Sequence, residues 1–284
     1  RVTMNFGIQN SFSALDGKLE NLQNANDSNL YIQIISDGRY GAYSTNRLNS
    51  KELEMFIKEA IRTNGYLAPD PARTLPPKEL CWFGKEDNLN QYDNFILEMD
   101  PAQKKDIAFE VMDEIHGKNR KIVSVNTEYG DMLEYQYMVD SQGFEGDSLQ
   151  SNFTVSAECS VKGRGYARSE GWWYESALHF NEFTYKGCGE TALKRALEKL
   201  NPREMKGGSM NMIVDNTCSS RLVSPIFQAL NGSNIQQRNS FLMERKGEKV
   251  FSNKLTLKDN PHWVGMSGSR YFDGDGIATR PMEI

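Results

Sequence analysis

Residues 151–163 read SNFTVSAECSVKG and hold the clearest two-residue period in the chain. Apolar and polar side chains alternate here, as they do when one face of a β-strand is buried and the other is solvated. The apolar positions are Phe153, Val155, Ala157, Cys159 and Val161. The stretch therefore predicts a long strand with one buried face, inside a long β region.

The residues before this strand predict hairpins followed by a helix. Apolar residues alternate in LYIQII at 30–35, and Asp16-Gly17 and Asp37-Gly38 supply the positive-φ residues that tight turns favour. Apolar residues then recur at helical spacing, which predicts a helix from Asn49 or Ser50 to about Asn64-Gly65. The first part of the chain is expected to be an antiparallel sheet with a helix.

Two further helices are expected on either side of the long β region. Asp100-Pro101 is typical of a helix start, so we expect a helix to about His116, before Gly117. A second helix is expected over 189–200, and the apolar MNMIV at 210–214 predicts another strand. Sheets and helices without a regular strand-helix-strand rhythm favour an α+β fold, with antiparallel sheets and flanking helices in two to three subdomains, over a doubly wound α/β fold.

The chain of 284 residues is long enough for more than one domain. Changes in pattern predict an N-terminal hairpin-and-helix domain (1–78), a linker (79–99), a central β-rich domain (100–205) and the start of a C-terminal domain (206–284). Because the chain begins with Arg1 and stops at Ile284 directly after a glycine-rich run, we expect both ends to be cut from something longer.

Composition excludes several classes of function. The net charge of −5 and the pI near 5.4 disfavour a broad phosphate-binding surface, so direct binding of nucleic acid is not expected. No window approaches a membrane span, and no secretory signal is present at the first residues. The four cysteines form no C-x-x-C pair, which indicates a reducing cytoplasm.

Familiar chemical motifs are incomplete in this sequence. Gly163-Arg164-Gly165 lacks the third glycine of a dinucleotide loop, and GMSGS at 265–269 is not a G-x-S-x-G elbow. Asp273 and Asp275 in FDGDG resemble the start of a calcium loop, but no glutamate closes it, so a turn is the better interpretation. The three histidines are far apart, and WWY at 172–174 is more typical of core packing than of a ligand platform.

The stretch LVSPIFQALNG at 222–232 predicts a helix whose apolar stripe is core, with Ser224 and Gln228 on the opposite side. The stripe comprises Leu222, Val223, Ile226, Phe227 and Leu230. Ser224-Pro225 is the expected cap and first turn, with Ser219 or Ser220 as the earlier alternative, and Asn231-Gly232 is the expected end.

Residues 212–261, from MIVDNTCSSRLVSPIFQALNG to LKDNP, and GSRYFDGDGIATR at 268–280 resemble the TldD/PmbA family, once described as modulators of DNA gyrase. DGKLENLQNAN, SDGRYGAYSTN and SQGFEGD also look like it. The resemblance implies a cytoplasmic peptidase built from a TldD-type and a TldE-type (PmbA) subunit, of which the TldD-type alone carries H-E-x-x-x-H. The family's helix ends in a Leu-x-Gly pattern, which we align on Leu230–Gly232. This alignment places Val223 and Gln228 at the two histidines of the motif and Ser224 at its glutamate.

The resemblance thus implies the PmbA/TldE branch, a subunit that is not catalytic alone, needs no metal or cofactor and completes a cleft for a peptide or unfolded protein. Expected partners are a TldD-like metal-bearing subunit or a second copy of the chain. Candidate contact residues are Asn239, Ser240, Phe241, Arg270, Asp273, Gly276 and Arg280. The alternative is a self-sufficient homodimer that binds peptides or another ligand without hydrolysing them, and direct action on DNA or gyrase is a third, disfavoured hypothesis.

Overall fold

The structure, a computed structural model, describes residues 1–84 and 88–284. It divides into two compact units, which are treated separately below. The first comprises residues 1–202 and 259–282, and the second comprises residues 203–258 and 283–284. Residues 85–87 of the predicted linker lie outside the described residues, and the predicted domain boundaries stay a prediction.

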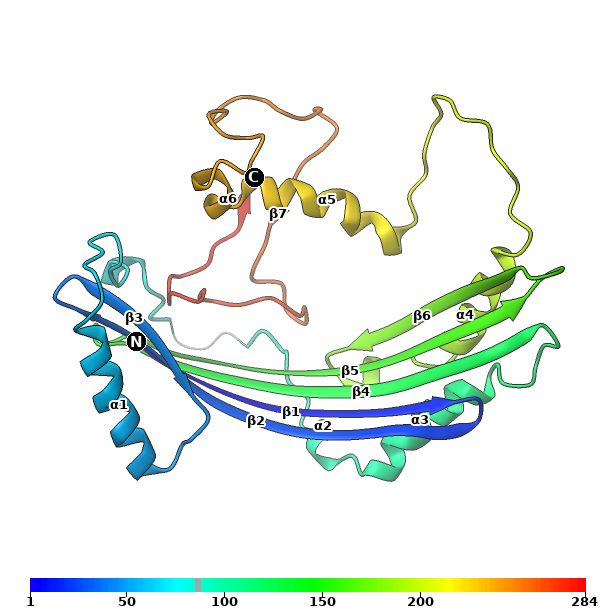
Figure 1. The fold of residues 1–284 in the computed structure, drawn as a ribbon, viewed down its shortest axis with the longest axis horizontal. Coiled ribbons are helices and arrows are strands. Elements are labelled where there is room, and N and C mark those ends of the chain that lie inside the picture. Colours follow the sequence, from blue (N-terminus) through cyan, green and yellow to red (C-terminus); the bar gives the residue numbers. More distant parts are fainter. Residues whose placement is uncertain (85–87) are drawn as a thin grey trace. The chain divides into compact units, whose positions relative to one another are not determined.

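The first unit is built on a six-stranded antiparallel sheet in the order β3-β2-β1-β4-β5-β6. Figure 1 shows these long strands running side by side. Their bounds are β1 Val2–Leu15, β2 Lys18–Ser36, β3 Arg39–Thr45, β4 Ile122–Val139, β5 Glu145–Lys162 and β6 Arg168–Ala177. β1 pairs with both β2 and β4, so the N-terminal hairpins and the central strands share one sheet. The fold class is α+β, as predicted.

Local sequence fixes the turns and the helix starts of this unit. Asp16 and Asp37 adopt positive φ at the two hairpin turns, each followed by a glycine with positive φ, which confirms both predicted turns. Asn49 caps the first helix, and Asp100 forms a capping box with Gln103 at the start of the longer one. The helices are α1 Ser50–Asn64, η1 Lys78–Leu80, α2 Phe95–Glu98, α3 Pro101–Asp113, η2 Phe180–Glu182 and α4 Cys188–Glu198. The predicted helices are confirmed to within a few residues at their ends.

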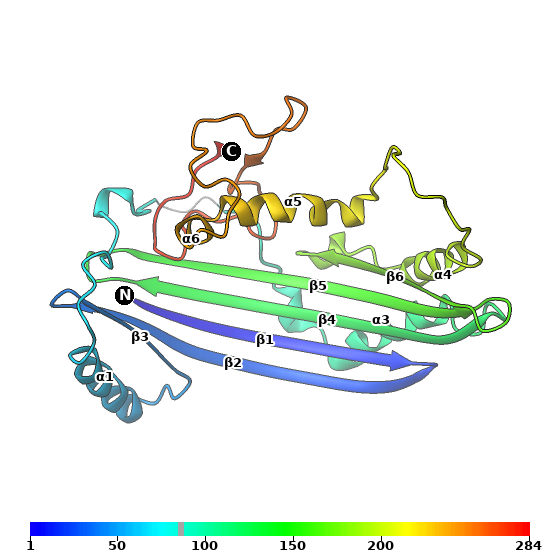
Figure 2. The same cartoon turned by 45° about the horizontal axis from the view of Figure 1, so that its top comes forward.

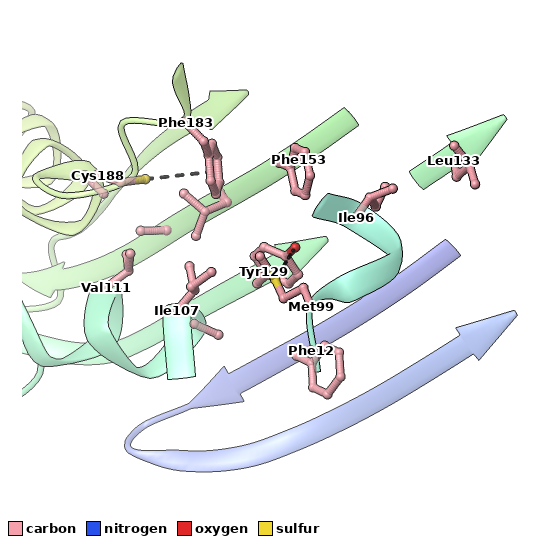
Figure 3. Close-up of a cluster of buried hydrophobic side chains, with 14 residues drawn as sticks. Phe12, Ile96, Met99, Ile107, Val111, Tyr129, Leu133, Phe153, Phe183 and Cys188 are labelled. Atoms are coloured by element: carbon pink, nitrogen blue, oxygen red, sulfur yellow. Dashed lines mark hydrogen bonds between the residues drawn. The ribbon is translucent and has the colours of Figure 1, made fainter. Parts of the chain in front are cut away.

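The main core lies between the sheet and helices α3 and α4, which cover one face of its strands (Figures 1 and 2). All five apolar residues of the opening stretch are fully buried there. Figure 3 shows the central cluster, in which Tyr129 of β4, Phe153 of β5 and Phe183 lie together, with Ile107 and Val111 of α3 facing them. Burial of these large side chains accounts for the long alternating pattern.

One buried polar network crosses this core. The Lys104 ammonium of α3 lies 2.9 Å from a carboxylate oxygen of Asp131, and both side chains are less than a tenth exposed. The Tyr129 hydroxyl and the Asn10 amide donate hydrogen bonds to the same carboxylate, at 2.9 and 2.7 Å. Asn24 extends the network by donating to Asn10. Every charge in the network therefore has a partner, as buried charges require.

The aromatic triplet of β6 divides between the two faces of the sheet. Trp173 packs against the core, and the Arg195 guanidinium lies 4.3 Å from its ring centroid. Trp172 and Tyr174 are about half exposed and stack on each other with ring centroids 4.9 Å apart. The predicted core packing is right for Trp173 and wrong for its two neighbours, because successive strand residues point to opposite faces.

The second unit contains α5 Asn216–Leu230 and α6 Gly232–Gln236. The predicted start of the first of these helices at Ser224 is wrong, since α5 begins at Asn216 with the Asp215 side chain accepting the Thr217 N–H. Pro225 lies inside the helix, where the Ser224 hydroxyl donates to the Ser220 carbonyl. Asn231 ends α5 as predicted, but Gly232 starts α6, and the predicted strand at 210–214 is irregular chain.

The apolar stripe of α5 is not core in this structure. Leu222, Phe227 and Leu230 are exposed, and Ala229 is the buried residue of the helix. In the irregular chain that follows α5 within its unit, the Ser240 hydroxyl donates to the Ala229 carbonyl at 2.6 Å. Two short strands, β7 Lys258–Asp259 and β8 Met282–Glu283, pair near the ends of this part of the chain. No helix among the described residues is long and apolar enough to span a bilayer.

Candidate functional site

A row of amide side chains crosses the sheet face opposite α3 and α4. Gln136 of β4 donates to Asn5 of β1 at 3.0 Å, and Asn5 donates to Asn29 of β2 at 3.0 Å. These residues are direct cross-strand partners, so alternation along each strand places all three on one face. We call them the amide row. It presents further N–H and C=O groups to whatever lies over the sheet.

The amide row forms part of the floor of a cleft of about 1000 Å³ within the first unit. One wall is the segment 268–274, and the cleft is also lined by Trp82, Asn88, Leu89, Gln91 and Tyr92. This volume is at the upper end of the range of pockets that hold small ligands. The cleft is therefore large enough for a short stretch of extended peptide.

Several contacts hold the wall segment against the sheet. The Gln91 side-chain amide donates to the backbone carbonyls of Met266 and Ser269 at 2.8 and 3.1 Å and to the Gln150 side-chain oxygen of β5 at 3.4 Å. Phe272 packs edge-on against Phe144, with ring centroids 5.2 Å apart. The wall is thus anchored to the sheet by side chains of the same unit.

A buried ion pair stabilises the end of this wall. The Arg1 guanidinium lies 2.6 Å from an Asp275 carboxylate oxygen and 3.6 Å from Asp140, and the side chains of Arg1 and Asp140 are almost fully buried. It also donates to the backbone carbonyl of Asp275 at 2.6 Å. These bonds fix the turn that follows the wall.

The charged groups of the floor are Asp27 of β2 and Glu134 of β4. Both pair with Gly7 of β1, one from each side, so the two carboxylates flank a residue without a side chain. In the described part of the chain neither carboxylate has a hydrogen-bond or ion-pair partner. We call the space over Gly7, between Asp27 and Glu134, the Gly7 gap.

The predicted contact residues are divided between the two units. Arg270 and Asp273 line the cleft, whereas Gly276 and Arg280 do not. Asp273 accepts the N–H groups of Asp275 and Ile277, which bears out the turn interpretation of FDGDG. Gly276 has φ +74° and lies against the Phe144 ring. The predicted contacts Asn239, Ser240 and Phe241 belong to the second unit.

The three positions aligned with H-E-x-x-x-H lie on α5. Val223 is half-buried, while Ser224 and Gln228 are exposed. Valine has no ligand atom, and a hydroxyl or an amide replaces neither an imidazole ligand nor a carboxylate base. Throughout residues 1–84 and 88–284, no three His, Cys, Asp or Glu side chains are grouped so as to hold a metal ion. The residues present do not fit a catalytic zinc.

Two histidines and two buried cysteines of the described chain lie in surroundings that indicate a structural role. His179 lies 2.9 Å from the Asn90 carbonyl oxygen, and His262 lies 3.1 Å from the Thr279 hydroxyl. Burial raises the pKa of the Cys159 thiol to about 11 and, together with nearby Glu175 and Glu114, that of Cys188 to about 12. A thiol with a raised pKa is a poor nucleophile at neutral pH.

The floor residues of the cleft were not predicted from the sequence. Asn5, Asp27 and Glu134 are polar residues at solvent-facing positions of strands, and most such residues have no special role. Only pairing across three strands brings them together. Gly7 within a strand pattern was the one local signal, because a glycine there weakens a strand and often marks a close approach.

Comparison with known proteins gives one consistent result. Three domain models described as PmbA/TldA metallopeptidase match residues 5–63 (domain 1), 95–200 (central domain) and 207–284 (C-terminal domain). The chain is 24% identical to the metalloprotease PmbA homolog of Haemophilus influenzae and to the metalloprotease PmbA of Escherichia coli, and covers 60% of each of them with 96% of its own length. It thus spans about 60% of the length of these relatives.

Solved structures agree. A candidate modulator of DNA gyrase from Bacteroides thetaiotaomicron is 42% identical and superposes with a TM-score of 0.95, over 99% of this chain and 64% of that one. TldE from Thermococcus kodakarensis is 16% identical, with a TM-score of 0.78 over 99% of this chain and 63% of that one. At that identity the second match supports the fold alone.

Proposed function

Because the chain belongs to the PmbA/TldD family, we propose that it is the non-metal, TldE-like subunit of a two-subunit cytoplasmic peptidase. In this proposal a TldD-like partner supplies the metal and the chemistry of hydrolysis. The present chain helps to hold the peptide or unfolded protein that the partner cleaves.

The observation that carries this proposal is the composition of α5. The positions that the resemblance aligns with the histidines and the glutamate of the family motif are Val223, Gln228 and Ser224, all on α5. A catalytic zinc site needs three protein ligands and a general base beside the bound water. Since none of these three side chains replaces an imidazole ligand or a carboxylate base, we expect the partner to supply the catalysis.

The cleft supports the binding half of the proposal. Its floor is sheet, and the amide row offers donors and acceptors of the kind that a peptide backbone needs. An extended peptide exposes its backbone N–H and C=O groups, and a side-chain amide can both accept from the first and donate to the second. The cleft is accordingly the place where we expect substrate to contact this subunit.

Reconstitution tests the proposed function. The full-length protein and an H-E-x-x-x-H relative from the same cell would be purified separately, and cleavage of an unfolded protein would be followed for each alone and for the mixture. We expect cleavage by the mixture and little by either subunit alone. The matched control is a partner whose motif glutamate is replaced by glutamine, which should abolish cleavage. Undiminished cleavage by the partner alone would sink the proposal.

A second candidate is a homodimer that binds peptides without hydrolysing them. It is favoured by the exposed stripe of α5, where Leu222 is 53% and Phe227 is 48% exposed, since exposed apolar patches often mark protein contacts. Light scattering of the protein alone and mixed with the relative distinguishes the two candidates. A stable homodimer that does not associate with the H-E-x-x-x-H relative favours this second function.

A further inference from the structure

The glycines within the strands of the sheet differ in how much space the fold leaves for a side chain. Five lie within the named strands of the described sheet: Gly7, Gly41, Gly130, Gly146 and Gly171. At the last four, an added Cβ would lie closer than 3.0 Å to a neighbouring atom of the chain, a distance that real Cβ atoms essentially never show. At Gly171 these atoms are backbone of α4, and at the other three positions they are side-chain atoms, so a side chain at any of the four would displace a neighbour.

At Gly7, in contrast, the fold leaves room for a Cβ atom. The nearest heavy atom to an added Cβ would be the Leu133 carbonyl oxygen at 3.9 Å, an ordinary van der Waals distance, and the φ of Gly7 is not positive. A glycine in the middle of a strand weakens it, and where the fold does not need one it is typical of a place that a ligand approaches closely. Gly7 lines the cleft, so that ligand would occupy the cleft floor.

The neighbours of Gly7 indicate the charge of this ligand. Asp27 and Glu134 lie one strand away on either side, which puts their Cα atoms roughly 10 Å apart. Alternation along the paired strands puts both side chains on the face of the gap, where both are exposed to solvent. The remaining space suits one ammonium or guanidinium group in contact with both carboxylates. A side chain at residue 7 would fill that space.

Other charged groups around the cleft leave this negative floor uncompensated. The Asp273 carboxylate accepts a backbone N–H within its own turn. Asp147 is on the opposite face of the sheet, where it is the cross-strand partner of Tyr137. Arg270 is the one cationic residue in the described lining of the cleft, and no ion pair joins it to Asp27 or Glu134. No described side chain neutralises Asp27 or Glu134.

We propose that the cleft selects peptides with a basic side chain, and that the ammonium or guanidinium group of this side chain sits in the Gly7 gap between Asp27 and Glu134. The adjacent amide row, two residues along the strands, binds the peptide backbone. The inference rests on the proposed function, because it names the substrate class of the same cleft.

The test uses labelled, extended peptides of alanine and serine that differ at one central residue, which is arginine, citrulline or glutamate. Citrulline keeps the shape of arginine without its charge. Binding to the full-length protein would be measured by fluorescence anisotropy. We expect the arginine peptide to bind about tenfold more tightly than the citrulline peptide, a preference that falls as salt is raised.

Two independent changes should remove this preference. Asp27→Asn with Glu134→Gln removes the charges, and Gly7→Thr fills the gap with a residue that strands favour and whose Cβ would meet no atom closer than 3.9 Å. The matched control is Glu20→Gln with Glu158→Gln, which neutralises two exposed carboxylates of the same sheet outside the cleft lining and should keep the preference. Thermal unfolding of each variant verifies that it folds.

The outcomes separate this inference from the proposed function. Equal binding of the arginine and citrulline peptides, or a preference that survives both sets of changes, overturns the inference. If partner-dependent cleavage is intact in that case, the proposed function stands. Cleavage that requires no partner overturns the proposed function, even if the preference for arginine is found.

Discussion

At the residue scale, the fold depends on a few buried polar groups whose partners must all be present. Lys104 and Asp131 form an ion pair inside the main core, supported by Tyr129 and Asn10. Burial, followed by the nearby Asp131 carboxylate, raises the pKa of Tyr129, so its hydroxyl remains a donor at any ordinary pH. The network therefore holds α3 to the sheet through several linked bonds.

Replacing Lys104 by methionine should destabilise the protein strongly. It would leave the Asp131 carboxylate buried without its cation, which typically costs about 3 to 5 kcal/mol. Combining Lys104→Met with Asp131→Asn should recover part of this loss, because no unpaired charge then remains. Urea unfolding of both variants measures the difference. If the double variant is no more stable than the single one, the charge is not the cause.

Stability should also decline at alkaline pH. The pKa of Cys188 is about 12 in the folded protein against an ordinary value of 9.0, because burial disfavours the thiolate. The folded state therefore keeps a proton that the unfolded state loses, and its stabilising contribution is complete below pH 9 and declines as pH rises from 9 towards 12. Urea unfolding between pH 8 and pH 10.5 should show this decline, and Cys188→Ala should reduce its slope.

The matched control for this pH dependence is Cys218→Ala. Cys218 is exposed on α5, so its replacement should leave the slope unchanged. An equal effect of the two replacements would show that burial of Cys188 is not responsible.

At the element scale, the sequence predicts what short-range physics decides. The alternation of β5, the turns at Asp16 and Asp37 and the caps at Asn49 and Asp100 all appear as expected, because each depends on neighbouring residues alone. The burial of the α5 stripe and the cleft floor could not be predicted in this way. Both depend on which segments meet across long stretches of chain, and strand register in particular decides that Asp27 and Glu134 flank Gly7.

The two kinds of strand glycine should respond differently to alanine. Gly171→Ala would drive a Cβ into the backbone of α4 at Ala192 and Ala196, so the helix must shift and we expect a loss of about 1 to 3 kcal/mol. Gly7→Ala should be neutral or stabilising by up to about 1 kcal/mol. Alanine loses less conformational entropy than glycine in a strand, and its Cβ would displace no neighbouring atom. Chemical unfolding of the two variants compares them. A large loss for Gly7→Ala would mean that the fold needs this glycine.

At the scale of the whole molecule, binding and chemistry are expected to be divided between two subunits. The first unit holds the cleft, and the aligned α5 positions of the second unit carry neither an imidazole nor a carboxylate. In the proposed division, this chain keeps the architecture of a peptidase family and a TldD-like partner carries the metal. The division predicts that substrate preference and hydrolysis respond to changes in different chains.

The metal content of the full-length protein tests the central claim most directly. After purification without chelators and incubation with zinc, the protein should contain no stoichiometric zinc by mass spectrometry of the element, while an H-E-x-x-x-H relative treated in the same way should retain it. One equivalent of tightly bound zinc in this protein would show that it has a complete ligand set of its own and would contradict the account.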